Sequence, residues 1–92
     1  MIVSAGAASR HYTRAMNTTR VLDLLEAGDW KAAHEIVQKE SSTLAAWLHG
    51  IVHILEGDLD NARGWYRKAE REFPGAGAVK QEIAAARRSA TG

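Results

Sequence analysis

Two histidines, His49 and His53, lie four residues apart in the otherwise apolar stretch AWLHGIVHILEGD. In a helix, residues at i and i+4 share a face, which is the spacing needed for two imidazoles to bind one metal ion. His34 belongs to the preceding helical segment and would face them if the two helices pack side by side. The three residues His34, His49 and His53 therefore form a candidate site for a divalent metal, with an open coordination position of the catalytic type.

Other chemistry fits the same residues. The histidines could form a half-buried seam hydrogen-bonded to Glu35, Glu56 or backbone carbonyls, or they could act in acid–base catalysis. HEIVQ at 34–38 begins like the zinc-protease motif H-E-x-x-H but ends in Gln38, so that motif is excluded. Satisfied buried polar groups are the rule, so the sequence favours the hydrogen-bonded seam over metal, and metal over catalysis. A seam of neutral buried imidazoles would destabilise the fold when protonated.

Composition restricts the possible functions. The absence of cysteine removes disulfides, thiol catalysis and cysteine-based zinc sites, and suits a reducing cytoplasm. The net charge of +1 is too small for a typical nucleic-acid-binding domain of 92 residues. No apolar run is long enough for a membrane span. We therefore expect a cytoplasmic, non-catalytic protein without a required cofactor, preceded by a loosely ordered extension at residues 1–16.

Helical hairpins are predicted by two glycine–aspartate pairs, Gly28-Asp29 and Gly57-Asp58. Glycine readily adopts the left-handed conformation that ends a helix, and aspartate then caps the next helix. No strand pattern competes with this all-α prediction. We expect five helices, at about residues 18–27, 30–39, 43–56, 59–73 and 79–90, with Pro74 ending the fourth.

Small and aromatic residues recur with a repeat-like spacing in the second hairpin. Gly50, Ala62, Tyr66, Ala69 and Pro74 stand where a W-x₂-L-G-x₂-Y, A-x₃-F, P pattern has glycine, alanine, an aromatic residue, a second small residue and proline. The segment resembles a tetratricopeptide repeat. The resemblance implies antiparallel hairpins stacked side by side, about two here over residues 17–92, with the last helix capping the stack.

The departures from the repeat pattern fall on the histidines. Ala46 fills the tryptophan position, with Trp47 one residue late, and His49 and His53 replace leucine and tyrosine. The first hairpin keeps its turn and Ala33 but lacks most signature residues.

The third predicted helix has a broad apolar arc opposite its histidines. In a repeat of this kind, part of that arc would face the concave groove that the family uses to bind peptides. The arc could instead be covered by the extension or the first helix. The function favoured from the sequence is binding of a peptide, another protein or a second copy, through Leu44, Trp47, Ile51, Ile54 and Trp65.

A basic stripe on the fourth predicted helix, Arg63, Arg67 and Arg71, beside Trp65 offers a nucleic-acid alternative. Glu70 and Glu72 dilute its charge, which favours a solvated face, and no nucleic-acid partner is expected.

Overall fold

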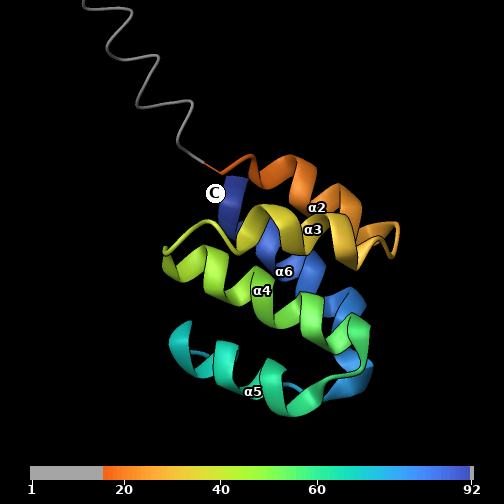
Figure 1. The fold of residues 1–92 in the computed structure, drawn as a ribbon, viewed down its shortest axis with the longest axis vertical. Coiled ribbons are helices and arrows are strands. Elements are labelled where there is room, and N and C mark those ends of the chain that lie inside the picture. The colour runs from red at the N-terminus through yellow and green to blue at the C-terminus, as the bar shows by residue number, and fades with distance from the viewer. Residues whose placement is uncertain (1–15, 92) are drawn as a thin grey trace, which may run out of the picture.

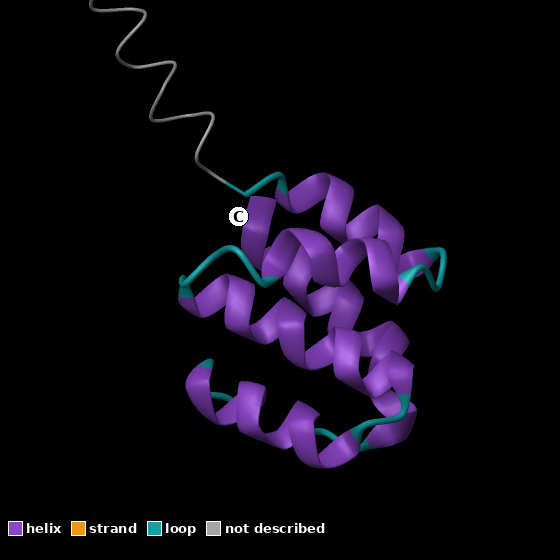
Figure 2. Cartoon of the chain, in the orientation of Figure 1, coloured by secondary structure: helices purple, strands orange, loops and turns teal. Residues whose placement is uncertain are grey.

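The computed structural model describes residues 16–91, and over these the chain is all helical (Figure 1, Figure 2). The predicted extension falls almost wholly outside the described residues, and its last residue, Met16, packs against the core. The all-α fold predicted from the sequence is confirmed. The elements are α2 (Thr18–Glu26), α3 (Trp30–Val37), α4 (Thr43–Glu56), α5 (Leu59–Lys68), the 3₁₀ turn η1 (Ala76–Ala78) and α6 (Val79–Thr91).

Two tight turns fold the first four helices into hairpins. Gly28 and Gly57 have φ values of 80° and 92°, a left-handed conformation that glycine adopts without steric cost. The aspartate after each glycine caps the next helix: Asp29 accepts from the Ala32 N–H and Asp58 from the Asn61 N–H. The helix starts and turns thus follow from local sequence signals.

The hairpins stack so that α2, α3, α4 and α5 follow one another along the long axis of the molecule (Figure 1). The α3–α4 contact joins the first hairpin to the second, and α6 crosses over α2 and α4. Among the described helices, none combines the length and apolar character needed to cross a membrane.

The end of α5 differs from the prediction. The helix was expected to continue to residue 73, but it ends at Lys68 because Glu70 adopts a φ of 60°. The chain turns back after Glu70, and its N–H groups bond to carbonyls in the last turn of α5. The Arg71 N–H, for example, donates to the Tyr66 carbonyl. Phe73 then packs edge-on against the Tyr66 ring, with centroids 5.6 Å apart.

The long α5–α6 connection lets α6 cover the apolar face of α4. Trp47 Nε1 and the Tyr66 hydroxyl both donate to Glu82 Oε1 of α6, at 3.0 and 2.7 Å. Ile83 and Ala86 of the same helix enter the core. A single carboxylate thus ties α4, α5 and α6 together around an apolar centre.

At Gly50 the helices α4 and α5 lie so close that a side chain would not fit, which gives a test of this packing. A Cβ at Gly50 would lie 2.5 Å from Tyr66 Cδ1, and the ring cannot easily retreat because its hydroxyl is bonded to Glu82. We expect Gly50→Ala to lower the free energy of unfolding by about 2 kcal/mol, the usual cost of overpacking. Urea unfolding measures it. Gly64→Ala is the matched control, since a Cβ there meets nothing within 4 Å, and it should be neutral or stabilising. Equal stability of the two variants would contradict the packing described.

Candidate metal centre formed by three histidines

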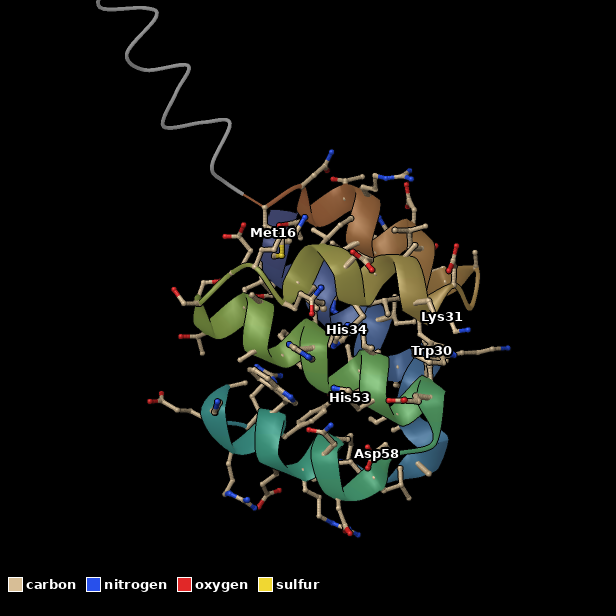
Figure 3. The ribbon with its side chains drawn as sticks, viewed as in Figure 1. Met16, Trp30, Lys31, His34, His53 and Asp58 are labelled. Atoms are coloured by element: carbon tan, nitrogen blue, oxygen red, sulfur yellow. The ribbon has the colours of Figure 1, made fainter. Side chains whose placement is uncertain are left out.

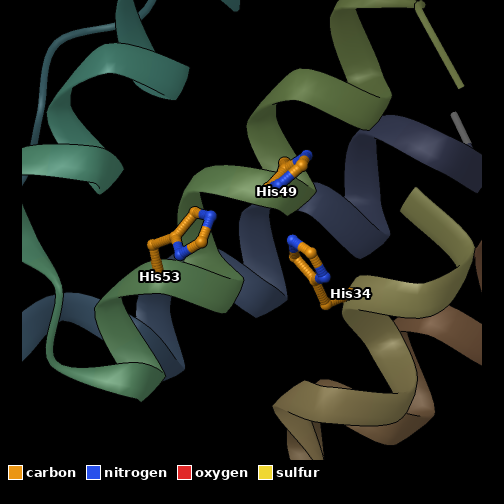
Figure 4. A group of neighbouring side chains, drawn as sticks. All are labelled: His34, His49 and His53. Carbon is orange, nitrogen blue, oxygen red and sulfur yellow. The ribbon is translucent and has the colours of Figure 1, made fainter. Parts of the chain in front are cut away.

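Three imidazoles converge between α3 and α4. His34 comes from the middle of α3, and His49 and His53 come from successive turns of α4 (Figure 3, Figure 4). The ring centroids of His34 lie 4.8 Å from His49 and 5.5 Å from His53, and the two α4 rings are 5.0 Å apart. One nitrogen from each ring lies within 4.8 Å of the others. The structure therefore brings together the three residues singled out in the sequence.

His49 is nearly enclosed and has no hydrogen-bond partner. Only 4% of the residue is exposed, and neither ring nitrogen makes a hydrogen bond to any part of the chain that the structure describes. No fully enclosed side-chain nitrogen or oxygen among the described residues lacks a partner, so the nitrogens of His49 keep narrow contact with solvent. A buried imidazole in this state is unusual, because buried polar groups normally find partners.

His53 is held differently, by a carboxylate of its own helix. Its Nδ1 lies 2.7 Å from Glu56 Oε1, one turn further along α4. This contact orients the ring and leaves Nε2 for another partner, the arrangement usual for metal-binding histidines. The predicted hydrogen-bonded seam is thus present at His53 through Glu56, but it does not extend to His49.

The spacing of the nitrogens is close to that of a bound site. In a tetrahedral zinc site with Zn–N bonds of about 2.0–2.1 Å, ligand nitrogens lie about 3.3 Å apart. Starting from nitrogens within 4.8 Å, small rotations of the rings would reach that distance. The helices need not separate for an ion to bind.

His49 is neutral over the physiological pH range. Its pKa is lowered from 6.5 to about 4, chiefly by burial and also by the nearby charges of His53, His34 and Lys68. A metal displaces protons from its ligands, so a histidine that is already neutral binds without that competition. This favours His49 as a ligand.

Trp65 of α5 closes the other side of His49. The indole is stacked on the imidazole, with centroids 3.7 Å apart and an interplanar angle of 9°. Lys68 Nζ lies 4.4 Å from the Trp65 ring centroid. The sequence suggested Trp65 as a partner-binding residue, and its place against a histidine was missed because it depends on how α5 lies on α4.

The predicted partner-binding face is not an open surface. Trp47 is only 3% exposed, and Ile51 and Ile54 are also buried, whereas Leu44 and Trp65 are half-buried. The sequence left open whether the chain itself or a partner covers this face. In the structure α6 packs on α4, and Glu82 of α6 accepts a hydrogen bond from Trp47. Among the described residues this cover includes α6, and the predicted cover by residues 1–15 lies outside the part of the chain that the structure describes.

A second group of possible ligands shares His53 with the cluster. His53, Glu56 and Asp58 have potential ligand atoms within 4.8 Å of one another. Both carboxylates are exposed, Glu56 already holds His53, and Asp58 caps α5. These contacts give the carboxylates structural roles beside the histidines.

The basic stripe predicted on the fourth helix is largely engaged by the chain itself, and its last member, Arg71, lies beyond the end of α5. Arg63 pairs with Asp60 at 3.2 Å and lies over the Phe73 ring, and Arg71 lies over Trp47. Two of the three arginines thus have contacts within the chain, and their presence does not require a nucleic-acid partner.

Comparison of the chain with protein-family models, with curated proteins and with solved structures found no match. The likeness to the tetratricopeptide repeat is therefore one of sequence pattern alone, and the histidine cluster is the main guide to function.

Proposed function

We propose that this protein binds one divalent transition-metal ion through His34, His49 and His53. The observation that carries the proposal is His49, a nearly enclosed imidazole that lies beside two further imidazoles and whose nitrogens have no hydrogen-bond partner within residues 16–91. A metal ion would satisfy these nitrogens, as a hydrogen bond does elsewhere in a protein core.

The donor set indicates the class of metal. Three imidazoles suit Zn²⁺, Cu²⁺, Co²⁺ or Ni²⁺, whereas Mg²⁺ and Ca²⁺ require oxygen ligands. Glu56 supports this class by holding Nδ1 of His53, since a carboxylate on the far nitrogen makes an imidazole a better ligand.

The position of the ligands indicates what the ion would do. His34 lies on α3 in the first hairpin, and the other two lie on α4 in the second. An ion bound by all three would join the two hairpins at their contact, because metal binding to the folded state adds to its stability. We propose this structural role, and it requires no catalysis.

Binding of a peptide, a protein or a second copy through α4 is the other function considered from the sequence. Trp47, Ile51 and Ile54 are buried, and Trp47 is bonded to Glu82 of α6, so binding through this face would require the helices around it to open. The geometry thus favours the metal proposal.

Titration calorimetry of the full chain, treated with chelator and then exchanged into metal-free buffer, tests the proposal with Zn²⁺ and Co²⁺. We expect one equivalent to bind and expect the double variant His49→Leu/His53→Leu to lose at least a hundredfold in affinity. His11→Ala is the control: it removes the one histidine that is not proposed as a ligand, and it should bind as the unchanged chain does. Absence of Zn²⁺ and Co²⁺ binding to the unchanged chain, or equal binding by the double variant, would refute the proposal.

A further inference from the structure

We infer that Trp65 determines which metal the site accepts, by fixing the ring of His49 for tetrahedral ions. This inference rests on the proposed metal-binding function. It assigns a positioning role to a residue that would not touch the ion.

The first step is the environment of the His49 ring. Trp65 lies flat on one side at 3.7 Å, and the His53 ring lies nearly parallel to it, at 5.0 Å and an interplanar angle of 23°. His34 meets His49 edge-on, with an interplanar angle of 85°. The His49 ring is thus restrained by an indole from α5 and by imidazoles from two helices, and a tilt larger than the small rotations needed for binding would break its stack with Trp65.

The second step is the direction of the lone pairs. A histidine nitrogen binds a metal in the plane of its ring, so a fixed ring fixes the direction of its bond to the ion. Two nitrogens from successive turns of α4 and one from α3 form a set of three imidazole nitrogens within 4.8 Å of one another, and the His34 ring stands nearly perpendicular to the His49 ring. Such a set suits tetrahedral Zn²⁺ and Co²⁺.

The third step is what other ions would require. Ni²⁺ and Cu²⁺ favour a square-planar or tetragonal arrangement of nitrogen ligands. Rearranging the ligands around such an ion would turn the His49 ring out of its present plane, and the Trp65 indole stacked on the ring opposes that turn. Removing the indole would free this motion and so favour Ni²⁺ relative to Zn²⁺.

Lys68, beside Trp65, offers a way to separate the effect of stacking on metal affinity from the effect of charge. Lys68 lies over the indole and also acts on His49 through its charge. An ammonium repels every divalent ion alike, so Lys68→Met should strengthen Zn²⁺ and Ni²⁺ binding together and leave their ratio unchanged.

The experiment measures the Zn²⁺ and Ni²⁺ affinities and the visible spectrum of bound Co²⁺ for the unchanged chain, Trp65→Leu and Trp65→Phe. The unchanged chain should show the intense bands of tetrahedral Co²⁺. In Trp65→Leu we expect the bands to weaken and the Zn²⁺ affinity to fall about tenfold, the lower end for residues that support metal ligands. The Ni²⁺ affinity should fall less. Trp65→Phe keeps an aromatic ring at this position, so it should retain most of the preference for Zn²⁺ over Ni²⁺ that Trp65→Leu loses. A role of Trp65 in folding alone would not explain that result.

Trp30→Phe is the matched control. Trp30 also has a lysine over its ring, with Lys31 Nζ 5.8 Å from the ring centroid. Within residues 16–91, however, the Trp30 ring contacts no histidine ring. Trp30→Phe should keep both the ratio of the Zn²⁺ and Ni²⁺ affinities and the visible spectrum of bound Co²⁺. An unchanged ratio and spectrum in Trp65→Leu, with Zn²⁺ still bound, would overturn the inference and leave the metal site standing. Failure of the unchanged chain to bind Zn²⁺ and Co²⁺ would overturn both.

Discussion

Zn²⁺ in excess should raise the midpoint of thermal unfolding by about 10–20 °C, the largest effect we expect. An ion that binds only the folded state, present at a hundred times its Kd, stabilises that state by about 2.7 kcal/mol. For a domain of this size, each kcal/mol shifts the midpoint by about 4–8 °C. Scanning calorimetry measures the shift, and a chelator should reverse it.

Scanning calorimetry of His34→Ala with Zn²⁺ tests whether the metal site spans both hairpins or is confined to α4. His34 is the ligand from the first hairpin, so its loss leaves two imidazoles on one helix. Most of the Zn²⁺-induced shift should then disappear. Glu35→Ala, a change at the exposed neighbouring position, should keep it. A full shift in His34→Ala would show that the ion does not join the hairpins.

The helices were predictable where capping signals are local. The bounds of α4 agree with the prediction because Ser42 caps its start and Gly57 ends it in a left-handed conformation. The end of α5 was not predictable in this way, because the left-handed residue there is Glu70, a type with no preference for that conformation. Its position is set instead by tertiary contacts such as that of Phe73 with Tyr66.

The convergence of the histidines was also predictable, since it needs only the i, i+4 spacing and the packing of neighbouring helices. Two other features of the site could not be predicted from the sequence. The missing hydrogen bonds of His49 depend on side-chain conformations, and the stack with Trp65 depends on how α5 lies against α4. The cover over Trp47 was missed for a similar reason, because a lone glutamate in α6, Glu82, gives no sign in the sequence that it bonds to a distant indole.

In the metal-free protein, held in chelator, acid should destabilise the fold through His49. Its pKa is about 4 in the folded chain, against an ordinary 6.5, chiefly because of burial. Between these two values the unfolded chain binds a proton at His49 and the folded chain does not. Stability is therefore retained above pH 6.5 and lost as the pH falls toward 4, by up to about 3 kcal/mol at about 1.4 kcal/mol per pKa unit.

The groups around His49 set the size of this loss. His34 from α3, His53 from α4 and Lys68 from α5 all add positive charge or the capacity for it near the ring, and each lowers the pKa of His49. No carboxylate among the described residues is hydrogen-bonded to His49 to offset them. A proton on His49 would therefore meet repulsion from three helices in addition to the cost of burial.

His49→Leu should remove this acid sensitivity and restore the residue that the repeat pattern has at this position. Urea unfolding at pH 7 and pH 4.5 gives the loss of stability for each protein, and the unchanged chain should lose more than His49→Leu by about 2–3 kcal/mol. Carboxylates titrate in the same range, but they are common to both proteins and cancel in the difference. His11→Leu, which removes the one histidine not assigned to the cluster, should behave as the unchanged chain does. Equal losses in the unchanged chain and His49→Leu would mean that His49 does not carry the acid sensitivity, and the lowered pKa derived from its burial would be wrong.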